Sequence, residues 1–118
     1  MKNYIDGQWT DAASGETFED RNPARTSDLI GRFPRSGGAD VDRAVKAARA
    51  AFAAWSRMPA PQRGDILKRI GDLLVERKDA IAFEMTREMG KPHFETKGDV
   101  QEAIDTAYYA ASETRRLF

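Results

Sequence analysis

The chain has 118 residues, of which 41% are hydrophobic and 32% are charged, with 19 basic and 19 acidic side chains. The formal net charge of +0 gives no reason to expect a nucleic acid or an anionic membrane as partner. The lack of cysteine excludes disulfides, a thiolate nucleophile and thiolate metal ligands from these residues, and no apolar run approaches the ~18 residues of a transmembrane helix. We expect a cytoplasmic protein.

Short strands are predicted in the first third of the chain. Within residues 4–9, Asp6-Gly7 stands between aromatic and aliphatic residues, which favours a two-residue hairpin turn because glycine adopts positive φ without a Cβ clash. Residues 17–21 alternate as a strand does, and Pro23 ends that strand because proline has no N–H for a ladder. Residues 28–33 are a further strand candidate and are followed by another proline.

A first helix is predicted over about residues 39–57, after the loop Ser36-Gly37-Gly38. Asp40 and Asp42 lie in its first turn, where acidic side chains suit the positive end of the helix dipole. Apolar residues recur at spacings of three and four and so form one stripe along the helix. The stripe contains Val41, Ala44, Val45, Ala48, Phe52 and Trp55.

Two further helices are predicted within residues 61–92, which hold the densest run of large aliphatic residues. The first has a buried face made of Ile66, Leu67, Ile70, Leu73 and Leu74. The pattern breaks near Arg77, and a new helix follows from about residue 79 to residue 89. Its apolar face consists of Ile81, Ala82, Met85 and Met89. Gly90 is expected just after the helix end, and Pro92 prevents its continuation.

The last helix is predicted from about residue 94 to the end of the chain. Its buried face consists of Val100, Ile104, Ala107, Tyr108 and Ala111. It would end on Leu117-Phe118 without a cap, which is typical of a chain that continues into a larger fold. The predicted class is therefore α/β, with a hairpin and strands in residues 1–35 and helices in residues 39–118.

The sequence offers few residues for catalysis. His93 is the only histidine and directly follows Pro92, so a position on the surface or at a helix start is preferred over a general base, which needs an oriented partner. The pair Gly37-Gly38 does not belong to a G-x-G-x-x-G pattern and is interpreted as the start of a helix rather than as a phosphate-binding loop. With one histidine and no cysteine, a transition-metal site built by this chain alone is not expected.

Two acidic residues near the end of a predicted helix leave two interpretations open. Glu84 and Glu88 lie where the helix dipole disfavours anions by ~0.3–1 kcal/mol. Arg87 and Lys91 are near enough along the helix to offset these charges, which requires no function. The alternative is that Glu88 binds a monovalent cation or a distant positive group.

These features occur in an order that is known from one family. The matching pieces are residues 4–9, 17–19, 22–24, 30–34, 40–45, 47–52, Trp55, Arg63, residues 66–67, 73–74, 76–77, 88–92 and 108–110. In this order and spacing the sequence resembles the N-terminal part of the aldehyde dehydrogenase superfamily, over essentially the whole chain. Glu88-Met89-Gly90-Lys91-Pro92 is the sharpest single match.

The resemblance implies a fold and a reaction. Family members oxidise aldehydes to carboxylic acids with NAD or NADP: a cysteine thiolate attacks, an oxyanion hole holds the adduct, hydride passes to the nicotinamide, and a glutamate-activated water releases the acid. Their cofactor domain is Rossmann-like, and this segment would form the outer part of it, incomplete here. Family members usually form homodimers or homotetramers.

The resemblance also suggests roles for individual residues. In members with a structural monovalent cation, the position of Glu88 supplies a side-chain oxygen, and backbone carbonyls at the positions of Asp20 and Arg21 complete the site. The last helix borders the substrate entrance in some members, which would bring Gln101 and Asp105 near it. The family's nucleophile, base, oxyanion residue and nucleotide-binding loop match no residue of this chain.

Two hypotheses about function follow. In the first, the chain is a segment of an NAD(P)-dependent aldehyde dehydrogenase that is inactive alone, binds no cofactor alone, and requires the remainder of the fold or a complementary chain as partner. In the second, it is an independent helical module whose apolar faces bind a protein and which catalyses nothing.

Overall fold

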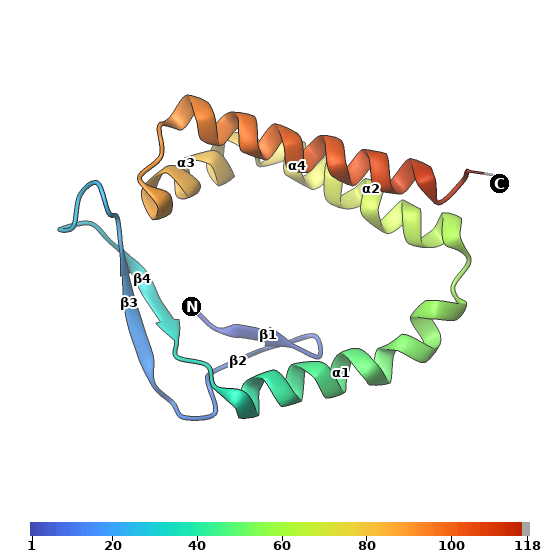
Figure 1. The fold of residues 1–118 in the computed structure, drawn as a ribbon, viewed down its shortest axis with the longest axis horizontal. Coiled ribbons are helices and arrows are strands. Elements are labelled where there is room, and N and C mark those ends of the chain that lie inside the picture. The colour runs from blue at the N-terminus through green and yellow to red at the C-terminus, as the bar shows by residue number, and fades with distance from the viewer. Residues whose placement is uncertain (117–118) are drawn as a thin grey trace. The chain divides into compact units, whose positions relative to one another are not determined.

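The computed structural model describes residues 1–116, which form four strands and four helices (Figure 1). These elements belong to two compact units, Met1–Arg57 and the residues from Met58 onward, called here the N-terminal and the C-terminal unit. The N-terminal unit contains β1 (Asn3–Ile5), β2 (Gln8–Thr10), β3 (Thr17–Arg21), β4 (Leu29–Pro34) and α1 (Gly38–Arg57). The C-terminal unit contains α2 (Ala60–Glu76), α3 (Lys78–Met89) and α4 (His93–Glu113).

The hairpin of β1 and β2 confirms the turn predicted at Asp6-Gly7. Ile5 lies opposite Gln8, so that two residues connect the strands. Asp6 has φ 52° and Gly7 has φ 75°, which is the pair of positive values that a type I′ turn requires. Tyr4 and Trp9 lie opposite each other with ring centroids 4.9 Å apart, so their contact supports the short ladder.

The second hairpin pairs β3 with β4 in antiparallel fashion. Phe18 lies opposite Phe33, and their stacked rings are 5.9 Å apart. The register shifts between Asp20 and Arg21, and β3 ends there, just before the proline that was predicted to end it. The start and the end of β4 each lie one residue later than the range 28–33 predicted from the sequence.

Helix α1 begins at Gly38, directly after the predicted loop. Its apolar stripe is largely uncovered by the described residues, since Val41, Phe52 and Trp55 are 59%, 65% and 42% exposed. The residue of α1 that is buried is instead polar, Asp40. The stripe therefore does not form a core within this unit.

The breaks predicted in the C-terminal unit are present. Arg77, with φ −109°, separates α2 from α3, and its N–H donates to the carbonyl of Leu73 at 3.1 Å. Gly90 ends α3 with φ 71° and donates its N–H to Thr86 O at 2.9 Å. In contrast, α4 ends at Glu113 and does not run to the end of the chain as predicted; the predicted apolar ending, residues 117–118, lies outside the described residues.

Helix α4 is the centre of the C-terminal unit and packs against both α2 and α3 (Figure 1). The core consists of Ala82, Val100 and Ile104, with Leu74, Ile81 and Met85 packed against it. The predicted faces of α3 and α4 are thus mostly confirmed, but Met89, predicted as a core residue, is 52% exposed because it lies in the last turn of α3, beyond these contacts.

The prediction for the buried face of α2 is wrong in part. Ile66 and Ile70 are 44% and 45% exposed, whereas Gly64 and Gly71 are the buried residues of this helix. A Cβ atom on Gly71 would lie 2.7 Å from Cε1 of Tyr108 on α4. The lack of side chains at these positions lets the two helix backbones approach closely, and that contact turns the isoleucines away from α4.

Candidate functional site

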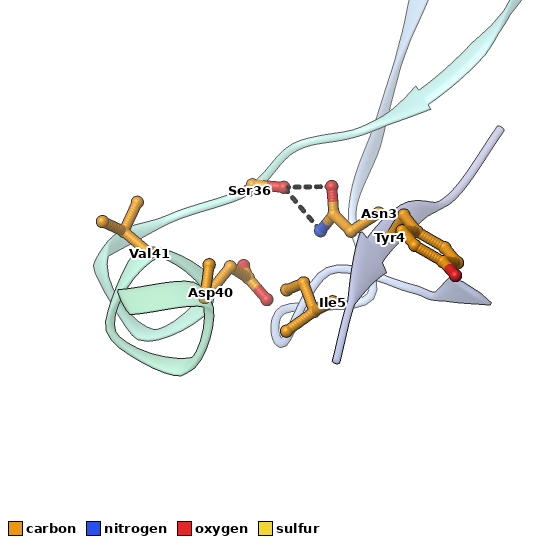
Figure 2. Close-up of a pocket in the computed structure, with 7 residues that line it drawn as sticks. Asn3, Tyr4, Ile5, Ser36, Asp40 and Val41 are labelled. Atoms are coloured by element: carbon orange, nitrogen blue, oxygen red, sulfur yellow. Dashed lines mark hydrogen bonds between the residues drawn. The ribbon is translucent and has the colours of Figure 1, made fainter. Parts of the chain in front are cut away.

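A shallow pocket of about 260 Å³ lies between β1 and the start of α1 in the N-terminal unit (Figure 2). It is lined by Asn3, Tyr4, Ile5, Ser36, Asp40, Val41 and Ala44. The lining includes two groups that could take part in chemistry, the hydroxyl of Ser36 and the carboxylate of Asp40. The contacts of each group decide what it can do.

Ser36 is held by the side chain of Asn3. The Nδ2 atom of Asn3 donates to Ser36 Oγ at 2.8 Å, and Ser36 Oγ donates to Asn3 Oδ1 at 3.1 Å (Figure 2). The hydroxyl proton is therefore directed to an amide oxygen and not to a base, which is the partner that a nucleophilic serine requires. This pair connects β1 to the loop before α1 and gives no sign of catalysis.

Asp40 is 3% exposed and organises the N-terminal end of α1. Its Oδ2 accepts the N–H of Gly37 at 3.0 Å, and its Oδ1 accepts the N–H of Ala13 at 2.9 Å and Nη2 of Arg43 at 3.0 Å. The hydrogen bond from Gly37, followed by those from Ala13 and Arg43, lowers the pKa of this carboxyl below its usual value. Asp40 thus caps α1 and joins it to the segment after β2.

The sequence contained a signal for this role of Asp40. An acidic residue at the third position of a helix can reach back to the N–H of the residue before the helix, as in a capping box. Gly37 and Asp40 have that spacing, but sequence reasoning assigned Asp40 only to the favourable end of the helix dipole. The hydrogen bond from Ala13 could not be foreseen, because it joins residues that are distant in sequence.

The start of α1 does not fit the phosphate groups of a dinucleotide. The N–H of Gly37, which a phosphate cradle would offer, donates to Asp40, and a buried carboxylate already occupies the positive end of the helix. A phosphate there would lie against a like charge. The interpretation of Gly37-Gly38 as a helix start therefore agrees with the geometry.

We expect acid to weaken the N-terminal unit through Asp40. A carboxyl with a depressed pKa in the folded state contributes stability above its unfolded pKa of about 3.9, and this stability is lost as the pH falls through the folded pKa. Asp40→Asn should lower the thermal midpoint at neutral pH and flatten its dependence on acid. The fluorescence of Trp9 and Trp55, both in this unit, reports the transition.

Asp42→Asn is the matched control for this experiment, because Asp42 is exposed on the same helix turn. The thermal midpoint of the Asp42→Asn variant should equal that of the unchanged chain across the pH range. Equal midpoints for Asp40→Asn and the unchanged chain at neutral pH would contradict the role given to Asp40.

The residues predicted for a monovalent cation lie in different units. Asp20 and Arg21 are in β3, where Nη2 of Arg21 is 2.7 Å from Oε2 of Glu19, and Glu88 is exposed near the end of α3. Among residues 1–116, no group of three or more histidine, aspartate or glutamate side chains is placed to hold a metal ion. The predicted site also relies on backbone carbonyls, and it stays a prediction.

The charges around Glu88 differ in part from the prediction that Arg87 and Lys91 offset the charges of Glu84 and Glu88. Arg87 pairs with Glu84, with Nη1 and Oε2 3.0 Å apart. Lys91, however, turns to α4, where its Nζ is 2.6 Å from Oδ2 of Asp99. The hydrogen bond that Lys91 donates to Asp99 raises the pKa of Lys91 above its usual value. Lys91 therefore joins α3 to α4 rather than neutralising the end of α3.

The two residues predicted near a substrate entrance, Gln101 and Asp105, are exposed on α4 and interact with each other. Nε2 of Gln101 donates to Oδ1 of Asp105 at 2.9 Å, and Nζ of Lys78 donates to Oε1 of Gln101 at 2.7 Å. Their proposed relation to a substrate stays a prediction. His93 is exposed at the start of α4 with its ring edge-on to Phe83 at 6.4 Å, which confirms the surface position preferred for it.

Sequence reasoning missed the buried hydroxyl of Thr96. This side chain is fully buried, and its Oγ1 lies 2.9 Å from Ala82 O, 3.0 Å from His93 O and 2.9 Å from Oγ1 of Thr86. The contacts join the first turn of α4 to α3. A single threonine at a helix start carries no pattern that would have indicated this.

None of the helices in residues 1–116 combines the length and the apolar character needed to span a bilayer.

Two surfaces of the described residues could serve a function. One is the pocket of Figure 2, whose polar groups bind one another, and the other is the uncovered apolar faces of α1 and α2. The second surface is suited to contact with further protein.

Comparison with known proteins gives one consistent result. A sequence model of the aldehyde dehydrogenase family matches residues 9–118. The chain is 39% identical to glutarate-semialdehyde dehydrogenase of Pseudomonas aeruginosa over 115 residues, which are 98% of this chain and 24% of that protein. Among solved structures, an NADP-dependent enzyme of E. coli is similar with a TM-score of 0.94 and 35% identity, over 99% of this chain and 24% of that one.

An NAD-dependent aldehyde dehydrogenase of Sinorhizobium meliloti is also similar, with a TM-score of 0.91 and 33% identity over 99% of this chain and 24% of that one. The 118 residues thus span about a quarter of the length of each of these proteins. Within that quarter, the similarity extends over nearly every residue of the chain.

Proposed function

Because this chain belongs to the aldehyde dehydrogenase family and matches an N-terminal part of its members, we propose that it is a structural segment of an NAD(P)-dependent enzyme that oxidises an aldehyde to a carboxylic acid. The observation that supports this most is the similarity to an NAD-dependent aldehyde dehydrogenase, with a TM-score of 0.91 over 99% of the chain at 33% identity. The segment has the fold that this part has in complete enzymes, and its role is to supply that part of the architecture.

The 118 residues alone are expected to be inactive. The family's chemistry begins with a cysteine thiolate, and these residues contain no cysteine. The start of α1, the glycine-rich helix start of the chain, is occupied by Asp40 and does not suit a nucleotide phosphate. We therefore place the nucleophile, the base and the cofactor site in the rest of the enzyme.

The partner of this segment is the remainder of the aldehyde dehydrogenase fold, joined in one polypeptide or supplied by a complementary chain. Exposed apolar side chains on α1 and α2 support this proposal, because a self-sufficient domain would bury them. The complete enzyme is expected to form a homodimer or homotetramer in the cytoplasm. Similar structures include an NAD-dependent and an NADP-dependent enzyme, so the proposal covers both cofactors.

A hybrid enzyme tests the proposal. In it, this chain replaces the matching segment of the Pseudomonas aeruginosa enzyme, to which it is 39% identical. The hybrid should reduce NAD or NADP when glutarate semialdehyde is added, whereas the pure 118-residue chain should produce no reduced nicotinamide. Glutarate semialdehyde is the first substrate to try because the host enzyme is named for it.

Two outcomes would contradict the proposal. One is aldehyde-dependent formation of reduced nicotinamide by the pure chain, and the other is a hybrid that neither folds nor turns over the aldehyde while the host enzyme does. The second hypothesis, an independent binding module, predicts that the isolated chain stays monodisperse as its concentration rises. Concentration-dependent aggregation of the isolated chain through the uncovered apolar faces of α1 and α2 supports the segment instead.

A further inference from the structure

The hairpin of β3 and β4 has two outer edges, and the ladder determines which backbone groups point outward along them. The N–H of Arg35 donates to Glu16 O at 2.8 Å, so these two residues form a hydrogen-bonded pair just beyond the strands. In an antiparallel ladder, hydrogen-bonded and non-hydrogen-bonded pairs alternate. The non-hydrogen-bonded pairs, whose N–H and C=O groups point outward, are therefore Thr17 with Pro34 and Glu19 with Arg32.

The outer edge of β4 is blocked. Pro34 has no N–H to offer, and its carbonyl accepts the N–H of Ser36 at 3.0 Å. The carbonyl of Arg32 accepts the amino group of Met1 at 2.7 Å. A proline on the edge and a segment that covers it are two means by which proteins prevent a further strand from pairing there. We therefore expect no strand to add to β4.

The outer edge of β3 is open. Thr17 and Glu19 are exposed, and among residues 1–116 no other segment forms a hydrogen bond with their outward N–H and C=O groups. The carboxylate of Glu19 does not shield this edge, because its Oε1 is held 2.5 Å from Nη2 of Arg32 on the opposite strand. Accessible backbone groups along an extended strand are a template for a further strand.

The hairpin also lacks the support that a two-stranded ladder needs. Phe18 stacks on Phe33 but stays 43% exposed. Apart from their contact with each other, β3 and β4 make no extensive contact with another helix or strand within residues 1–116. An isolated two-stranded ladder is marginally stable, and a third strand or a packed face stabilises it. A strand on the open edge would supply both the backbone pairing and a cover for Phe18.

We propose that the outer edge of β3 receives an extended strand from the rest of the aldehyde dehydrogenase polypeptide. The backbone of that strand pairs with the outward groups of Thr17 and Glu19, and an apolar side chain on it covers Phe18. This inference rests on the proposed function. It names the surface of the N-terminal unit at which the further polypeptide attaches and the kind of segment that attaches there.

The size of the similar enzymes favours this occupant. The chain covers 24% of the E. coli enzyme and matches it over 99% of its own length with a TM-score of 0.94, so about three quarters of that enzyme is polypeptide outside the segment. A hairpin of this fold is thus present in a protein with ample further chain to supply a strand. A second copy of this chain is the competing occupant, and the experiment distinguishes the two.

Hydrogen–deuterium exchange measures whether the edge is covered. The experiment compares the isolated chain at low concentration with the active hybrid with the Pseudomonas aeruginosa enzyme, residue by residue, by mass spectrometry with electron-transfer fragmentation. The outward amides of Thr17 and Glu19 should exchange about a hundredfold more slowly in the hybrid than in the isolated chain. The outward amide of Arg32, on the blocked edge, is the matched control and should exchange quickly in both settings.

Proline at position 17 tests the same pairing through stability. It removes the outward N–H, and Pro34, directly opposite Thr17, shows that the ladder accepts proline at an outward position. Thr17→Pro should lower the thermal midpoint of the hybrid by several degrees and leave that of the isolated chain unchanged. Thr17→Val is the matched control, because it keeps the N–H, and it should leave both midpoints unchanged.

Several results would overturn the inference. These are fast exchange of the Thr17 and Glu19 amides in the active hybrid, equal slowing at Arg32, and an effect of Thr17→Pro that is absent from the hybrid or equal in both settings. Slow exchange in the isolated chain that increases with its concentration would assign the edge to a second copy. An inactive hybrid with the segment unchanged contradicts the proposed function itself, whereas an active hybrid with fast outward amides contradicts only this inference.

Discussion

Gly64→Ala is expected to be less stable than Gly98→Ala by about 1–3 kcal/mol, because both substitutions gain the same helix propensity but only the first meets an occupied space. A Cβ atom at position 64 overlaps the Thr114 hydroxyl and lies 2.8 Å from the backbone oxygen of Ala111. The hydroxyl can rotate away, but the carbonyl belongs to the α4 backbone. The α2–α4 contact must therefore open.

Because a glycine-to-alanine change raises helix propensity equally at positions 64 and 98, comparing the two variants isolates the steric effect at position 64. Gly98 is exposed on α4, and nothing lies within 4 Å of a Cβ atom there, so Gly98→Ala should stabilise the chain by about 0.5–1 kcal/mol. Urea unfolding followed by far-ultraviolet circular dichroism measures both values. Equal gains for the two variants would show that α2 and α4 are not in the close contact described here.

Thr96→Val is expected to cost about 1–3 kcal/mol of unfolding free energy. Valine has nearly the shape of threonine, so the loss reports the hydroxyl and not the packing. The substitution removes this partner from the hydroxyl of half-buried Thr86 and from the carbonyl of fully buried Ala82. Thr106→Val is the matched control, since Thr106 is exposed on the same helix, and its effect should be small.

A double substitution sharpens the test of the Thr96 cluster. When Thr86→Val accompanies Thr96→Val, the pair of hydroxyls is removed together, so one fewer buried group is left unpaired. The double variant should therefore be less destabilised than the sum of the two single variants. Strict additivity would mean that the two hydroxyls, 2.9 Å apart, do not stabilise each other.

Local signals explain which parts of the fold were predictable. The turn at Asp6-Gly7, the break at Arg77 and the end of α3 at Gly90 each depend on the backbone preferences of one or two residues, and each was predicted correctly. Such preferences act within a few residues and need no knowledge of the tertiary structure. The family resemblance rested on the same local pieces in sequence order.

The faces of the helices were harder to predict, and α2 shows why. Periodicity identifies large apolar residues, so Ile66 and Ile70 were assigned to the core. The contact that forms within the described residues uses Gly64 and Gly71, which have no hydrophobic signal at all. A helix that packs against two partners has two packing faces. The sequence pattern does not indicate which of these faces is covered within these 118 residues.

Little of the candidate site could be predicted from the sequence. The family's thiolate chemistry has no nucleophile among these residues, because they contain no cysteine. The contact of Asp40 with Ala13 and the buried hydroxyl of Thr96 were not found, because both depend on burial and on partners distant in sequence. Polar groups become informative once their surroundings are known.

The pairing of α2 with α4, across the intervening α3, also bears on how this polypeptide is made. On a ribosome, the stretch ending at Glu76 emerges well before the stretch ending at Glu113, and synthesis at about 5–20 residues per second puts a few seconds between them. During this interval neither face of α2 is covered by its partner. The nascent chain thus exposes an aliphatic helix during this interval, and slow translation after Glu76 would prolong that exposure.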